Sequence, residues 1–134
     1  MPAAEIRVAI NSDQDIVGAR QSGRALAAEL GFSSADATLI ATAISELARN
    51  IVSYARKGEI RIERIENSGH RGIIVVAADE GPGIPDVRQA LRDGFSTSGS
   101  LGLGLPGVRR LMDEFEINSR PGRGTTVTVK KWRH

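Results

Sequence analysis

The order of apolar and polar residues follows two periods along the chain, and each period predicts one type of element. Apolar residues at every second position are typical of half-buried strands, whereas apolar residues three and four apart indicate helices. Helices lie among strands that are joined largely by short turns, which predicts a two-layer α/β sandwich with a mixed sheet. The predicted elements are a strand over 5–10, helices over 12–31 and 33–56, strands over 59–65 and 72–79, a short helix over 87–92, a helix over 106–115, and strands over 116–119 and 125–131.

Local signals mark where these elements begin and end. Ser12 with Asp15, and Ser33 with Asp36, have the three-residue spacing at which side chains cap the start of a helix. Residues 66–72 are polar and contain two glycines, so they predict a turn between two strands.

Length and composition predict one domain over 1–134 with a single core. Aromatic residues make up only 4% of the chain, so this core must consist of Ile, Val, Leu and Ala. The formal net charge of +2 gives no reason to expect a nucleic-acid partner. No run of about 20 apolar residues predicts a membrane span, and we therefore expect a cytoplasmic protein.

The sequence excludes three common classes of site. The chain has no cysteine, which rules out disulfides, thiolate metal ligands and a cysteine nucleophile. None of its lysines lies in a glycine loop, so there is no P-loop. Gly102, Gly104 and Gly107 match the G-x-G-x-x-G of dinucleotide-binding folds, but no strand precedes them and no acidic residue follows in 125–133. These glycines need another explanation.

Two polar side chains stand out on the apolar face of the second predicted helix. Glu46 and Asn50 are four residues apart, so they project from one face about one turn apart. Such a pair often marks only the boundary between a core face and a solvated face. However, an Asn oxygen is also a ligand that Mg²⁺ accepts alongside phosphate oxygens, and a Glu can act as a general base toward a hydroxyl or water.

Three glycine-rich segments are further candidates for a site. Asp79 ends an apolar strand and is followed by Gly81 and Gly83, which let a flat ligand approach the backbone, although an Asp that caps its own turn is common. The segment 93–104 is rich in Gly and Ser and has little to bury, so we expect a lid that nucleotide orders. Its glycines at positions 99, 102 and 104 precede a helix start, where freed N–H groups bind phosphates; by themselves they also fit a flexible surface loop. The last segment, Gly122 to Thr125, is by itself an ordinary hairpin turn.

Each of these segments is a weak signal, but their order along the chain is specific. E-x-x-x-N on a helix, D-x-G-x-G after a strand, G-x-x-G-x-G before a helix and G-x-G-T before the last strand occur together in the GHKL ATPases and kinases. The chain resembles this family, also known as the Bergerat fold, over about residues 5–132. The resemblance implies a mostly antiparallel sheet with the helices on one face.

The resemblance also implies a site for ATP and Mg²⁺ between the helices and the lid. By that analogy Asn50 binds Mg²⁺, Asp79 accepts a hydrogen bond from the adenine amino group, and Thr125 supports the adenine end. Glu46 acts as the base. The nucleotide-binding glycines implied are Gly81 and Gly83 near the adenine, and Gly99, Gly102 and Gly104 near the phosphates.

Within the family, the chain is most similar to the serine protein kinases of bacterial partner-switching systems, in particular the stressosome switch kinases. The similarity lies in three stretches, ATAISELARNIVSYA, DEGPGIPDVRQALRDGFSTSGSLGLGLPGVRRLMDEF and VKKW. Neither the phosphoacceptor hairpin of a histidine kinase nor the transducer domain of a gyrase or mismatch-repair ATPase is expected, and His70 lies in a predicted turn.

This resemblance implies a kinase that phosphorylates a serine or threonine on a STAS-domain antagonist and, once released, activates a PP2C-type phosphatase. Two alternatives remain at this point: an anti-sigma factor that sequesters a sigma subunit, and a binding module that ATP gates without phosphoryl transfer. The presence of Glu46 favours the enzyme over the binding module, because nucleotide binding alone needs no base.

Overall fold

The computed structural model describes residues 5–81, 104–120 and 122–133. The short helix predicted over 87–92 and nearly all of the predicted lid therefore lie outside the described residues. The described elements are β1 (Ile6–Ile10), α1 (Asp13–Glu29), α2 (Ser34–Tyr54), β2 (Gly58–Asn67), β3 (His70–Asp79), α4 (Gly104–Leu111), β4 (Glu114–Arg120) and β5 (Gly124–Trp132).

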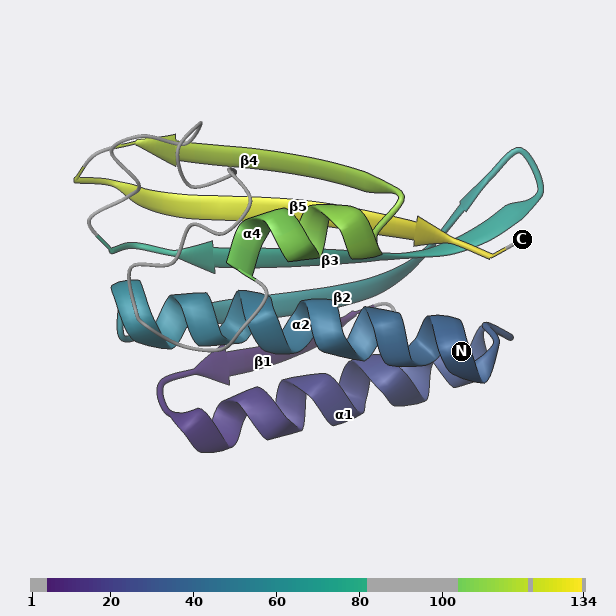
Figure 1. Cartoon of the computed structure of the whole chain (residues 1–134), viewed down its shortest axis with the longest axis horizontal. Coiled ribbons are helices and arrows are strands. Elements are labelled where there is room, and N and C mark those ends of the chain that lie inside the picture. The colour runs from purple at the N-terminus through teal and green to yellow at the C-terminus, as the bar shows by residue number, and fades with distance from the viewer. Residues whose placement is uncertain (1–4, 82–103, 121, 134) are drawn as a thin grey trace.

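The strands form one five-stranded sheet in the order β1-β2-β3-β5-β4, and every neighbouring pair is antiparallel. Figure 1 shows α1, α2 and α4 lying across one face of this sheet, with α1 and α2 side by side. This arrangement confirms the predicted two-layer α/β fold. Within the described part of the chain, no helix is long and apolar enough to cross a bilayer.

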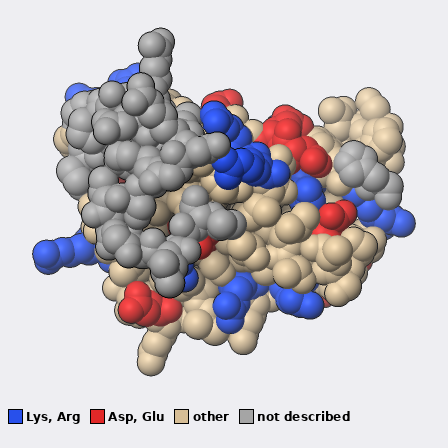
Figure 2. Space-filling model, in the orientation of Figure 1, with Lys and Arg blue, Asp and Glu red and all other residues tan. Residues whose placement is uncertain are grey.

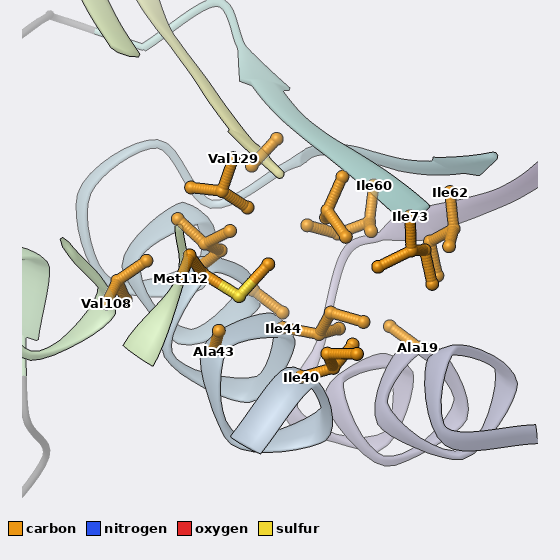
Figure 3. Packing of buried hydrophobic residues seen from close by; sticks show 14 of the residues in the cluster. Ala19, Ile40, Ala43, Ile44, Ile60, Ile62, Ile73, Val108, Met112 and Val129 are labelled. Carbon is orange, nitrogen blue, oxygen red and sulfur yellow. The ribbon is translucent and has the colours of Figure 1, made fainter. Parts of the chain in front are cut away.

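The core lies between the sheet and the helices. The alternation of apolar and polar residues in the strands places the apolar side chains on the face that the helices cover. Side chains of the sheet such as Ile62 and Val129 are fully buried and point toward the helices. Ile40 and Ile44 of α2 and Val108 of α4 meet them from the other layer, and all three are also fully buried (Figure 3). The core is therefore aliphatic, as the composition predicts.

The opposite face of the sheet carries charge where β1 pairs with β2. Arg7 donates a hydrogen bond to Glu59 at 3.2 Å from the neighbouring strand. A hydrogen bond between Glu5 and Glu63 raises the pKa of Glu63, and the same bond together with Arg7 lowers the pKa of Glu5. Charged side chains are best solvated by water, so this face of the sheet is exposed and the helices cover the opposite face.

The predicted helix starts are confirmed. The side chain of Asp15 accepts a hydrogen bond from the Ser12 backbone at 3.1 Å, and the Ser33 hydroxyl accepts one from the Asp36 backbone at 3.1 Å. Pro106 lies in the first turn of α4, where its missing N–H is no loss.

Two predicted boundaries are wrong. The turn predicted over 66–72 shrinks to Ser68 and Gly69, whose φ angles of 52° and 81° are those of a two-residue hairpin turn, and His70 already belongs to β3. Phe115 has helical spacing from Val108, but it lies in β4, because the chain leaves the helix after Leu111 and pairs with β5. Cross-strand pairing overrides the local sequence signal at both places.

Candidate functional site

Asp79 stands at the end of β3, where two backbone N–H groups fix its carboxylate. Gly81 donates to Oδ1 at 2.9 Å, and Thr125 at the start of β5 donates to the same oxygen at 3.3 Å. Within the described part of the chain, Oδ2 is therefore the oxygen left for a ligand. Asp79 is half-buried, so a ligand can reach its side chain. The pocket of about 350 Å³ that it lines with Asn11, Lys57 and Glu59 is not lined by Thr125, Glu46 or Asn50.

Thr125 is held by a residue that the sequence did not single out. Its hydroxyl and that of Ser119 at the end of β4 are 2.8 Å apart, and the Ser119 hydroxyl also lies 3.4 Å from the Gly124 carbonyl. Thr125 itself is 9% exposed. The ends of β3, β5 and β4 thus form one hydrogen-bonded group, which can present a fixed set of donors and acceptors to a flat base.

Close packing at this group depends on Gly124. Its φ of +102° is strained for any residue with a Cβ, and a Cβ built there would overlap the Asp79 carbonyl oxygen and lie 2.8 Å from the Glu80 Cα. A larger residue would therefore separate β5 from the end of β3.

We expect Gly124→Ala to lower the free energy of unfolding by about 1–3 kcal/mol, through backbone strain and overpacking. Denaturant unfolding followed by circular dichroism measures this change. The matched control is Gly122→Ala, because Gly122 has a similar φ of +77° but nothing within 4 Å of its Cβ position. Equal losses in the two variants would show that the contact with β3 contributes nothing.

The second part of the candidate site lies where α2 meets the start of α4. Glu46 is 7% exposed, and its Oε2 accepts a hydrogen bond from the backbone N–H of Gly104 at 3.4 Å. Its Oε1 lies 3.2 Å from Nη1 of Arg49, whose side chain is 43% exposed. A carboxylate at a helix N-terminus is stabilised by the helix dipole. Glu46 therefore marks an anion-binding position at the N-terminus of α4.

Gly104 begins α4 with a φ of +67°, a left-handed backbone conformation that glycine adopts without strain. Its N–H is one of the groups at a helix N-terminus that have no partner within the helix. The distance of 3.4 Å is longer than an ordinary N–H···O bond. A phosphate oxygen can therefore compete with the Glu46 carboxylate for this N–H.

Asn50 lies one turn after Glu46 on α2 and is half-buried. Among the described residues no group of three or more His, Cys, Asp or Glu side chains could hold a metal ion. The Asn50 amide alone still fits Mg²⁺, because this ion commonly takes one or two protein oxygens and completes its shell with phosphates and water. Any Mg²⁺ held at Asn50 therefore depends on a bound nucleotide for its other ligands.

The C-terminal end of α2 connects the two parts of the site. A Cβ on Gly81 would lie 2.6 Å from the Cβ of Ala55, so the residue after the Asp79 turn packs directly against the end of α2. Ala55 lies nine residues after Glu46, or about 13 Å along the helix axis. A ligand that reaches both Asp79 and the start of α4 must therefore be extended.

The structure thus brings Asp79, Gly81 and Thr125 together at one end, and Glu46 and Gly104 at the other. Three predicted glycines, Gly83, Gly99 and Gly102, lie outside the described residues. Sequence reasoning missed Arg49 and Ser119. No local signal distinguishes these two from ordinary surface residues, because only the fold places them beside Glu46 and Thr125.

Comparisons with known proteins show what the chain as a whole is similar to. A family model described as the histidine kinase-like ATPase domain matches residues 10–131. The serine/threonine-protein kinase RsbT of Bacillus subtilis (strain 168) is 58% identical over 125 residues, which cover 93% of this chain and 94% of that protein. The anti-sigma F factor of Thermoanaerobacter sp. (strain X514) is 32% identical over 128 residues, covering 92% of this chain and 89% of that protein.

Solved structures show the same fold at low sequence identity. The mycobacterial sensor histidine kinase MprB matches with a TM-score of 0.57 at 13% identity, covering 96% of this chain and 98% of that chain. The catalytic domain of the histidine kinase ThkA matches with a TM-score of 0.53 at 17% identity, covering 94% of this chain and 95% of that chain.

Proposed function

The chain belongs to the histidine kinase-like ATPase family and is an ATP-dependent protein serine/threonine kinase, and from this premise we propose that it phosphorylates a STAS-domain antagonist in a bacterial partner-switching pathway. The resemblance to the GHKL kinases, based on four short motifs, is confirmed. When the antagonist releases it, the kinase activates a PP2C-type phosphatase. It acts in the cytoplasm.

One observation carries the proposal for the site: the buried carboxylate of Glu46 contacts the N-terminus of α4. A helix N-terminus favours phosphate, so this contact supports Glu46 lying beside the phosphates of ATP. Asp79 supports the other end of the nucleotide. Two backbone N–H groups hold its Oδ1, so Oδ2 accepts from the adenine amino group, and Thr125 lies beside it. The glycines at positions 81 and 104 keep the backbone close to each end.

The proposed reaction uses Glu46 as the base. The oxygen of the partner's serine or threonine bonds to the γ-phosphorus of ATP while Glu46 accepts the hydroxyl proton. The bond between the γ-phosphorus and the bridging oxygen breaks, and ADP leaves with that electron pair. Phosphoryl transfer depends mainly on such positioning and on neutralising charge. Asn50 would hold Mg²⁺, which neutralises phosphate charge when it is bound.

Transfer of label from ATP tests this function. The purified chain is incubated with γ-labelled ATP, Mg²⁺ and candidate STAS-domain proteins, and label on the partner is followed together with co-elution of the two proteins. We expect label on a serine or threonine of one STAS partner, and loss of co-elution after phosphorylation. Stable co-elution without any label would favour an ATP-gated binding module instead.

A second candidate function is direct sequestration of a sigma factor. It is favoured by the relatives named anti-sigma F factor, which are about one-third identical to this chain over most of its length. Including sigma subunits in the same co-elution experiment decides between the two. Co-elution with a sigma subunit that a phosphorylated STAS protein does not affect would favour sequestration.

A further inference from the structure

Lys131 is a cation that the fold buries on the inner face of β5, where it is only 8% exposed. Lysine is rarely buried unless it is paired. Its Nζ donates to the backbone carbonyl of Leu111 at 3.0 Å and lies 3.8 Å from the Asp113 carboxylate. Leu111 is the last residue of α4, so Lys131 caps the C-terminus of that helix from the side of the sheet.

The helix α4 is short, and its orientation depends on contacts outside itself. Eight residues span about 12 Å, and isolated helices of this length are marginal in water. Leu105 and Val108 bury one side of it in the core. Glu46 contacts its N-terminus and Lys131 its C-terminus, and both charges have the sign that the helix dipole favours.

Exposed cations also lie on α4 itself. Figure 2 shows basic side chains gathered over the C-terminal half of α4, beside acidic side chains at the start of β4. The basic residues of this last turn are Arg109 and Arg110, both exposed. Lys131 instead reaches the end of α4 from the sheet, so it connects the helix to the layer that also carries Asp79 and Thr125.

We propose that Lys131 is a positioning residue for nucleotide phosphates. By fixing the C-terminal end of α4, it orients the N–H groups of the N-terminal end, beginning with Gly104, toward the phosphates. The proposal rests on the proposed nucleotide site. A short rigid helix transmits a tilt at one end to the other, so loss of the contact at the C-terminus of α4 moves the N–H groups at its N-terminus. The adenine end consists of Asp79 at the end of β3 and Thr125 at the start of β5, so it does not depend on α4 and keeps its geometry.

The test compares two ligands in Lys131→Met, which removes the ammonium but keeps most of the volume. We expect affinity for MgATP to fall about tenfold, the loss of roughly one hydrogen bond to a charged group, while affinity for adenosine stays unchanged. Calorimetry well below the melting temperature measures both affinities. A general loss of stability would lower the affinity for ATP and the affinity for adenosine alike.

The matched control is Lys130→Met, because Lys130 is the adjacent cation on the opposite face of β5, 3.9 Å from Glu114. It should leave both affinities unchanged, and Lys131→Arg, which keeps a cationic donor, should restore part of the ATP affinity. Equal losses for ATP and adenosine in Lys131→Met, or no loss for either, would overturn the proposal.

A second measurement does not depend on nucleotide. Hydrogen exchange of the α4 amides, Gly104 among them, should be faster in Lys131→Met than in Lys130→Met; equal exchange would also overturn the proposal. If Lys131→Met does not fold, Lys131→Gln, which keeps a neutral donor, takes its place. A wild-type chain that binds neither ATP nor adenosine would overturn the proposed function, whereas the exchange comparison would still decide whether Lys131 fixes α4.

Discussion

Replacing Glu46 by glutamine is expected to lower the rate of phosphoryl transfer by about 10²–10⁴-fold, the usual loss on removing a general base. Nucleotide binding should persist. The amide oxygen can still accept the hydrogen bond from Gly104 that Oε2 accepts now, so the start of α4 keeps its contact with α2. What the variant loses is the group that takes the proton of the acceptor hydroxyl. Single-turnover transfer from labelled ATP, with affinity measured separately, distinguishes the two effects.

Two further variants make this prediction specific. Glu46→Ala should lose transfer to a similar extent, but it also removes the contact with Gly104, so it should melt at a lower temperature than Glu46→Gln. Asn50→Ala should lose Mg²⁺-dependent nucleotide binding and transfer together, since Asn50 is the proposed metal ligand. A Glu46→Gln protein of unchanged stability that phosphorylates its partner at the normal rate would exclude Glu46 as the base.

The sequence predicted the elements well where one period extends over many residues. Both long helices and the strand around Ile62 follow from periodicity, because their apolar positions face one core. The strand around Val75 follows from a continuous run of apolar, β-branched residues. Prediction failed where pairing between strands competes with a local pattern. Phe115 has helical spacing from Val108, yet its backbone satisfies its hydrogen bonds in the β4–β5 ladder.

The site was predictable as a set of motifs and not as a geometry. Glu46, Asp79 and Thr125 were singled out because their segments occur in a known order. The contacts between these segments join residues far apart in the chain: Glu46 with Gly104, and Asp79 with Thr125. Arg49, Ser119 and Lys131 acquire their contacts only through the fold, and no local spacing reveals such contacts.

The second large effect is expected at Asp79. Asp79→Asn should weaken ATP binding at least about tenfold, the cost of losing a hydrogen bond to a charged group. The two backbone donors decide how the new side chain lies. Gly81 and Thr125 both donate to Oδ1, so the amide oxygen should take that position and the NH₂ group should take the place of Oδ2. An acceptor that faces the adenine amino group then becomes a donor, and two donors repel.

This reversal predicts a change of base preference as well as a loss of affinity. Adenine presents an amino donor at its 6-position, whereas guanine presents a carbonyl acceptor there. Hypoxanthine has the same carbonyl without the 2-amino group of guanine, so ITP is the sharper probe. The ratio of ITP to ATP affinity should rise in Asp79→Asn relative to wild type, while the melting temperature changes little because Oδ1 keeps its role. Calorimetry with both nucleotides measures the ratio. A folded variant with unchanged ATP affinity would remove Asp79 from base recognition. A variant that weakens ATP and ITP equally would mean that Asp79 acts only by shaping the turn at the end of β3.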